Sequence, residues 1–276
     1  MKKQVNPWDI ITTLLLCMTG LFMIFPFFMM LVTSFKDSRE IMVTGLNIFP
    51  KVPVLRNYVT VFKETLIVRY LFNGVVVAVS VLVGQLLVNI PAAYAFAKRD
   101  FPLKRLLFVG ILAALVFPKY IAAIPNFLLL SQFKRIDTYS ALIVPFIASP
   151  FCIFLMRQYI LTIPEDFFEA AKIEGCGIPR LLVTILVPMI RPAIGSFAIF
   201  SVVTHWNDFF WPLIVINSKK MFTPPAGIVF FAEAEGASDW GAVMAAALLT
   251  VSPLVVLFLS NRKQFITSLT STGVKG

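Results

Sequence analysis

The stretch YLFNGVVVAVSVLVGQLLVNIPAAYAFA, residues 70–97, decides the fold class of this chain. It contains no Asp, Glu, Lys or Arg and is longer than the roughly 20 residues that a helix needs to cross the hydrocarbon core of a bilayer. Five other apolar runs share this character: Ile10–Ser34, Leu106–Leu130, Ser140–Met156, Ala193–Ile216 and Ala242–Asn261. The sequence therefore predicts an all-α polytopic membrane protein with six transmembrane helices.

The composition supports the same class. Of 276 residues, 59% are hydrophobic and 14% charged, and the mean hydropathy is +0.88, which excludes a soluble globular domain and a disordered chain. The net charge of +10 comes mostly from basic residues in the short gaps between apolar runs, so it indicates a membrane surface and not nucleic acid. Three unpatterned cysteines and a single histidine predict no metal site, no disulfide framework and no enzyme.

Basic residues also indicate the orientation of the chain. With the N-terminus placed inside, 13 of the 24 basic residues fall on that side and 10 on the other, so we expect both termini in the cytoplasm. The first run is too long for a signal peptide and reads as an uncleaved span. We expect one transmembrane domain over 1–276, divided into a first span with an external loop (10–69), a five-span core (70–261) and a cytoplasmic tail (262–276).

The polar insert 157–192 between the fourth and fifth runs is too ordered for a linker. Thr162 is a candidate helix cap, with Pro164 at the first helical position and acidic residues in the first turn. Gly175 and Gly177 are expected to end this helix and to form an elbow, after which a second helix begins at Pro179. A helix that lies on anionic lipid usually has a basic polar face. This one is acidic, so a basic protein partner fits it better.

A motif in this insert carries a family resemblance. Glu169-Ala170-Ala171, then Gly175, Ile185 and Val187-Pro188 are similar to the pattern EAA-x3-G-x9-I-x-LP of permease subunits of bacterial ABC importers, with valine for one leucine. Four further segments resemble the six-span, maltose-type permeases for carbohydrates: Ser149–Phe151, Phe154–Gln158, Trp206–Leu213 and Gly273–Gly276. The resemblance covers nearly the whole chain.

This resemblance implies a set of partners in a bacterial cytoplasmic membrane. They are a second permease subunit, two cytoplasmic ATPases that bind ATP and magnesium, an external solute-binding protein and a carbohydrate substrate. It implies that Glu169 makes a polar contact with an ATPase, that Ala170 and Ala171 pack there, and that Gly175 provides the bend. Ile185 and Pro188 complete the coupling motif, and the tail residues Gly273, Val274, Lys275 and Gly276 are expected along the ATPase interface.

The chain has no G-x-x-x-x-G-K-[ST] motif and cannot itself cradle ATP phosphates, so it holds no cofactor of its own and its energy must come from a partner or a gradient. Polar residues inside the apolar runs are candidates for a substrate path, because such groups are costly in lipid and usually face a cavity or a partner. The candidates are Asn73, Gln85, Asn89, Lys119, Asn126, His205, Asn207 and Asp208. Path lining and structural pairing remain equally open for this set.

The residues bear on three classes of function. The leading hypothesis is a non-enzymatic permease half of a carbohydrate importer, and a permease for another solute, such as a polyol phosphate, is the alternative within that family. A solitary secondary transporter or channel predicts inverted repeats or a filter loop, neither of which is visible, and it leaves the acidic insert unexplained. An intramembrane enzyme lacks the necessary motifs.

Overall fold

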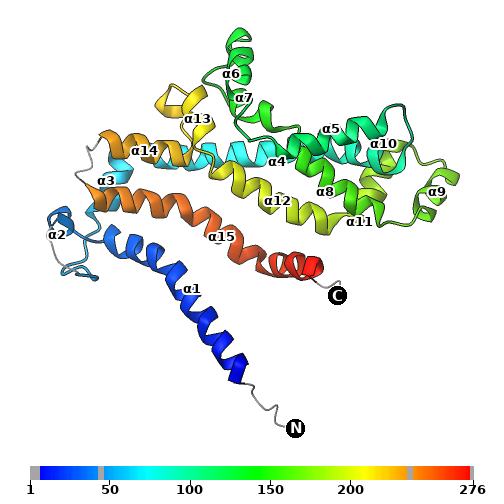
Figure 1. Ribbon diagram of the computed structural model, residues 1–276. Helices are drawn as coiled ribbons and strands as arrows, with labels where there is room; N and C mark the ends of the chain where they lie inside the picture. Colours follow the sequence, from blue (N-terminus) through cyan, green and yellow to red (C-terminus); the bar gives the residue numbers. More distant parts are fainter. Residues whose placement is uncertain (1–6, 43–46, 235–238, 274–276) are drawn as a thin grey trace. The chain divides into compact units, whose positions relative to one another are not determined.

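A computed structural model describes residues 7–42, 47–234 and 239–273 of the chain, and the described part is helical with no strand (Figure 1). The contacts divide the chain into two units, Met1–Ile67 with Gly227–Pro253, and Val68–Ala226 with Leu254–Gly276. The longer helices are α1 (Pro7–Ser34), α4 (Ile67–Lys98), α5 (Lys104–Val116), α6 (Ala123–Gln132), α8 (Pro150–Leu161), α12 (Arg191–Trp206), α14 (Pro224–Ala234) and α15 (Trp240–Gly273). The shorter elements are α2 (Ser38–Met42), α3 (Arg56–Glu64), α7 (Tyr139–Ile143), η1 (Val144–Phe146), α9 (Asp166–Ile173), α10 (Ile178–Leu181), η2 (Leu182–Leu186), α11 (Val187–Met189), α13 (Phe210–Val215) and η3 (Lys219–Met221).

Within the described residues, three helices are long and apolar enough to cross a membrane alone: Ile10–Ser34, Ile67–Lys98 and Trp240–Ser260. Two bent pairs raise this number to five if each pair counts as one span. The first pair, Tyr139–Phe146 with Pro150–Leu161, bends by 44°, and the second, Ile178–Met189 with Arg191–Trp206, bends by 82°. The membrane class is confirmed, whereas the count of six spans is not.

The structure breaks the predicted span Leu106–Leu130. Helix α5 ends at Val116, and α6 begins only at Ala123. Phe117 is extended (φ −69°, ψ 138°), as the residue before a proline prefers, and Pro118 cannot continue the helical hydrogen bonds. Similarly, the predicted span Ala193–Ile216 ends as a helix at Trp206, and α13 is a separate short helix.

The first unit is organised around Asn57, a residue of α3 that is almost fully buried. Its side-chain amide donates to the carbonyl oxygens of Ser34 and Lys36, at 2.8 Å each, and so holds the end of α1. Gly241 of α15 lies against the same amide, since a Cβ placed there would come within 2.4 Å of Asn57 Nδ2. A polar side chain therefore forms the centre of this unit, with all its amide hydrogens used.

The second unit has an apolar core formed by α4, α8, α9 and the stretch from α10 to α12. Its fully buried side chains include Met156, Ile160, Leu186, Ile190 and Phe197. In Figure 1, α5, α8 and α10 gather at one end of α4, and α9 lies beyond them. The element η2 is a π-turn, in which the amide of Val187 donates to the carbonyl of Leu182, five residues earlier. Thus the core reaches directly to the polar insert.

Candidate functional site

Helix α9 presents two different faces. Phe168 and Ala171 are one turn apart and are about 5% and 4% exposed, and Phe168 packs against the ring of Tyr94 with 5.8 Å between ring centroids. Glu169 and Ala170 are exposed on the other side, and Ile173 is 87% exposed. The helix is thus held by one face while an acidic and apolar face remains uncovered in the single chain.

The start of α9 differs from the expectation. Thr162 does not cap it, because its hydroxyl donates back to the carbonyl of Tyr159 in α8, at 2.7 Å. The helix begins at Asp166, with Glu165 in the cap position and no side-chain cap hydrogen bond. Ala171 was expected at the partner contact, but it lies in the core of this chain, one turn after Phe168. Glu169 and Ala170 are the motif residues that remain available.

The elbow after α9 is a hydrogen-bonded helix stop. Gly175 has a φ of +71°, and its amide donates to Lys172 O at 3.1 Å, while the Cys176 amide donates to Ala171 O at 2.9 Å. This pair of bonds is the Schellman motif, in which a left-handed residue ends a helix. Nothing lies within 4 Å of a Cβ placed at Gly175, so the backbone conformation and not the space requires glycine.

Lys98, the last residue of α4, ties α9 to the core. Its ammonium donates to the carbonyl of Ile163 and to the carboxylate of Glu165, both at 2.8 Å, and lies 5.0 Å from the ring centroid of Phe168. Sequence reasoning missed this residue. The available signal was that Lys98 directly follows the longest apolar run and that Glu165 lies in the insert on the same predicted side of the membrane.

The remaining motif residues lie on the path from α10 to α12. Ile185 is in η2 and packs against the apolar core, and Pro188 is exposed in α11. Of the predicted tail contacts, Gly273 is the last residue of α15. Val274, Lys275 and Gly276 lie outside the described residues, so their role stays a prediction.

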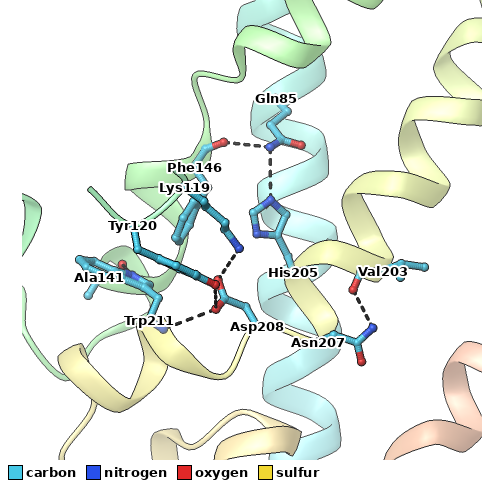
Figure 2. Close-up of polar contacts among 10 residues, drawn as sticks. All are labelled: Gln85, Lys119, Tyr120, Ala141, Phe146, Val203, His205, Asn207, Asp208 and Trp211. Atoms are coloured by element: carbon cyan, nitrogen blue, oxygen red, sulfur yellow. Dashed lines mark hydrogen bonds and ion pairs between the residues drawn. The ribbon is translucent and has the colours of Figure 1, made fainter. Parts of the chain in front are cut away.

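A second polar site surrounds Asp208, which follows the end of α12 and is 6% exposed (Figure 2). Its carboxylate accepts hydrogen bonds from Lys119 Nζ at 3.1 Å and from Tyr120 OH at 3.0 Å, and the Trp211 amide approaches within 3.4 Å. The indole of Trp211 in turn donates to the carbonyl of Ala141 at 2.9 Å. The break between α5 and α6 is therefore what delivers Lys119 and Tyr120 to the break after α12.

A chain of contacts leads from this ion pair to the middle of α4. Lys119 Nζ lies 5.6 Å from the ring centroid of Phe146, and that ring is 5.1 Å from the ring of His205. Gln85 Nε2 approaches His205 Nε2 within 3.4 Å and donates to the carbonyl of Phe146 at 2.9 Å (Figure 2). Ser201 Oγ donates to Gln85 Oε1 at 2.6 Å. These groups satisfy one another inside the second unit.

The asparagines of the candidate path separate into two kinds. Asn73 and Asn89 are fully buried and bonded: Asn73 donates to Lys220 O and Phe222 O and accepts from Tyr139 OH, and Asn89 donates to Gln85 O and Ile147 O and accepts from Ser149 N. Both are structural pairs. Asn207 is exposed and caps its own helix at Val203 O, pointing away from Asp208 (Figure 2), and Asn126 is half-buried in α6.

In the part of the chain that the structure describes, no three His, Cys, Asp or Glu side chains lie close enough together to hold a metal ion. Two groups of residues are thus candidates for function. One is the exposed face of α9, and the other is the partly exposed pair Lys119 and Tyr120 on the buried Asp208. Gln85, His205 and Trp211 support the second group and belong to the core.

Comparisons with known proteins agree on one family. Residues 89–264 match the family described as binding-protein-dependent transport system inner membrane component. The chain is 34% identical to the arabinooligosaccharides transport system permease protein AraQ of Bacillus subtilis (strain 168), over 100% of this chain and 99% of that protein. It is 30% identical to the sn-glycerol-3-phosphate transport system permease protein UgpE of Salmonella typhimurium, over 89% of this chain and 90% of that one.

A solved structure has the same fold. It is a chain from the crystal structure of a bacterial ABC transporter involved in the import of the acidic polysaccharide alginate. The TM-score is 0.82 with 20% sequence identity, over 95% of this chain and 99% of that one. The likeness supports the helical arrangement described above.

Proposed function

The chain belongs to the family of binding-protein-dependent transport system inner membrane components, and from this membership we propose that it forms half of the translocation path of an ATP-driven importer for oligosaccharides. It is a protein of the inner membrane. The second half of the path is a second permease subunit, and an external binding protein delivers the substrate. Both termini lie in the cytoplasm.

The observation that carries this proposal is the two-faced helix α9. Its inner face is locked into the core by Phe168 and by Lys98, so a displacement of α9 passes to α4 and α8 instead of being lost in a loop. Its outer face offers the carboxylate of Glu169 beside the exposed side chain of Ile173. A basic and apolar groove on an ATPase is the complementary surface. The ATPase, and not this chain, binds ATP and magnesium.

The substrate class follows from the relatives and from the charge of the candidate path. AraQ is named for arabinooligosaccharides and matches the full length of this chain. A polyol phosphate, as in the name of UgpE, needs an available cation at the path. Lys119 is already neutralised by Asp208, which favours an uncharged sugar. Hydroxyl groups of a sugar can bond to the partly exposed Lys119 and Tyr120 without breaking the ion pair.

The test is affinity purification of the full chain from its native membrane with Glu169→Lys as the variant. We expect the natural chain to copurify with a P-loop ATPase and a second permease, and the variant to lose the ATPase while keeping its own fold. Glu64→Lys, the same charge change at an exposed position of α3, is the matched control and should retain both partners. Purification of the natural chain alone would contradict the proposal.

Uptake separates the two substrate classes. Cells that carry the gene should accumulate labelled arabinotriose, and cells without it should not, while accumulation of labelled sn-glycerol 3-phosphate should be the same in both. The reverse pattern would contradict the oligosaccharide assignment and leave the importer assignment standing.

A further inference from the structure

A cavity of about 450 Å³ opens where α4 ends and α5 begins, within the second unit. Its volume lies within the range of small-ligand sites in proteins. The lining residues are Phe96, Asp100, Phe101, Leu103, Lys104, Arg105, Phe108 and Arg157. Three of them are basic and one is acidic, so the wall carries two net positive charges. The motif and the candidate path use none of these residues.

Arg157 is fixed in this wall with its charged end unused. Its Nε donates to the carbonyl of Phe96 at 3.1 Å, and its guanidinium carbon lies 4.0 Å from the ring centroid of Phe108. Among the described residues, its two terminal nitrogens have no hydrogen-bond partner and no carboxylate pairs with it. A guanidinium held this way is pre-organised to bind a phosphate group through two parallel hydrogen bonds.

The other charges in the wall are arranged to leave Arg105 available. Asp100 pairs with Lys104 at 3.3 Å and so neutralises part of the Lys104 charge. The side chain of Asp100 is itself fully exposed. Arg105 is exposed and, within the described ranges, forms no ion pair or hydrogen bond through its side chain. The cavity thus combines two uncompensated guanidinium groups with three phenylalanine rings.

The cavity lies beside an exposed apolar helix. Arg157 is on α8, which turns at Leu161 into α9, and Phe96 and Lys98 are at the same end of α4. Helix α5 leads away from the cavity and has no buried residue, with Leu106 65% and Val109 53% exposed. An apolar helix that starts at a basic cavity matches a molecule with an anionic head and an apolar tail.

We propose that this cavity binds the phosphate headgroup of an anionic phospholipid from the leaflet on the side of α9, with Arg105 and Arg157 on the phosphate and the acyl chains along α5. Basic cavities between membrane helices are a common form of anionic-lipid recognition. Arg157 joins α8 to α4 next to the Lys98 contact with α9, so the bound lipid would stabilise the part of the core that supports α9.

Native mass spectrometry of the full chain, delipidated in detergent and titrated with phosphatidylglycerol or phosphatidylcholine, tests the proposal. We expect retention of phosphatidylglycerol over phosphatidylcholine, and a loss of affinity of about tenfold or more in the variant Arg105→Gln/Arg157→Gln, because two charge-assisted contacts are removed. The matched control is Lys134→Gln/Arg135→Gln, which removes two exposed charges just after the end of α6. It should bind phosphatidylglycerol as the natural chain does.

Arg105→Gln alone keeps the test valid if loss of Arg157 disturbs folding, since Arg105 supports no other described side chain. It should weaken phosphatidylglycerol binding by a smaller factor. Equal lipid retention in the cavity and control variants, or equal retention of the two lipids, would overturn the proposal. Displacement of the bound lipid by millimolar inorganic phosphate would assign the cavity to a soluble anion and overturn it as well.

Discussion

The ammonium of Lys119 lies 3.1 Å from the buried carboxylate of Asp208, although 89 residues separate them in the sequence. Each residue occupies a break between two helices: Lys119 lies between α5 and α6, and Asp208 between α12 and α13. The ion pair therefore joins two points where apolar runs lose their helical hydrogen bonds. The same breaks that shorten the helices allow the charges to meet.

Loss of Lys119 should destabilise the chain more than loss of the Asp208 charge. Lys119→Met leaves a carboxylate whose side chain is 5% exposed without a cation, which should lower the free energy of unfolding by about 1–2 kcal/mol after allowance for the partial exposure of Lys119. Asp208→Asn keeps an acceptor for Tyr120 and leaves a lysine that can reach water. Thermal unfolding in detergent should rank the two in this order, with Lys134→Met unchanged. The opposite ranking would contradict the structural reading.

Gly175→Ala should destabilise the end of α9, and Gly177→Ala should not. Both positions have space for a methyl group, but only Gly175 has a positive φ, at +71°. The expected difference is about 1 kcal/mol in the free energy of unfolding, the cost of placing an ordinary residue in the left-handed region. Thermal unfolding of the two variants measures it, and ATPase copurification should weaken in the first alone. Equal behaviour would show that the elbow does not need glycine.

Asn89→Leu should be strongly destabilising because Asn89 holds the bend between η1 and α8. The change leaves the partly buried carbonyl of Ile147 and the amide of Ser149 without their partner. Each such group costs about 1–3 kcal/mol. The control Asn207→Ala removes only a bond to its own helix at an exposed position and should be nearly neutral. Comparison of yield and melting temperature of the two variants is sufficient, and a mild Asn89 variant would count against this anchor.

The contribution of Asp137 to stability should be complete at pH 6 and should decline as the pH falls below the ordinary carboxyl pKa of 3.8. Burial raises the pKa of this carboxyl, but the hydrogen bonds from the Ser218 amide, the Asn217 amide and the Ser218 hydroxyl outweigh that effect, so the pKa lies below the ordinary value of 3.8. A carboxyl with a lowered pKa stabilises the folded state at higher pH, and this contribution disappears as the pH falls through the folded-state pKa. The melting temperature of the natural chain should exceed that of Asp137→Asn at pH 6. The difference should shrink as the pH falls below 3.8, and a constant difference would contradict this explanation.

The sequence predicted uninterrupted helices well and broken ones poorly. Residues 70–97 form one helix, as their unbroken apolar character indicates. The run 106–130 looks equally continuous, yet Pro118 divides it. Other prolines, such as Pro91 and Pro253, remain inside long helices, so sequence alone does not tell the two outcomes apart. The break coincides with a tertiary contact, because Asp208 binds Lys119 and Tyr120 within it.

The candidate site shows the same limit. The motif located Glu169 and Gly175 correctly on an exposed helix and at a left-handed turn. It did not reveal that Ala171 faces inward, because the pattern records residue types and not which side of the helix meets the core. Asn73 and Asn89 were candidates for the path, but they bond to backbone groups 58 to 149 residues away, which no local pattern indicates.

The π-turn η2 holds one residue more than an α-helical turn would between α10 and α11. Each residue of an α-helix turns the chain by about 100°, whereas the wider π-turn takes up the extra residue locally. A deletion of one residue from 182–186 that restored a regular helix would therefore leave the faces of α10 and α11 almost where they are. The chain can thus gain or lose one residue at this point without a change in the direction in which the insert faces its partner.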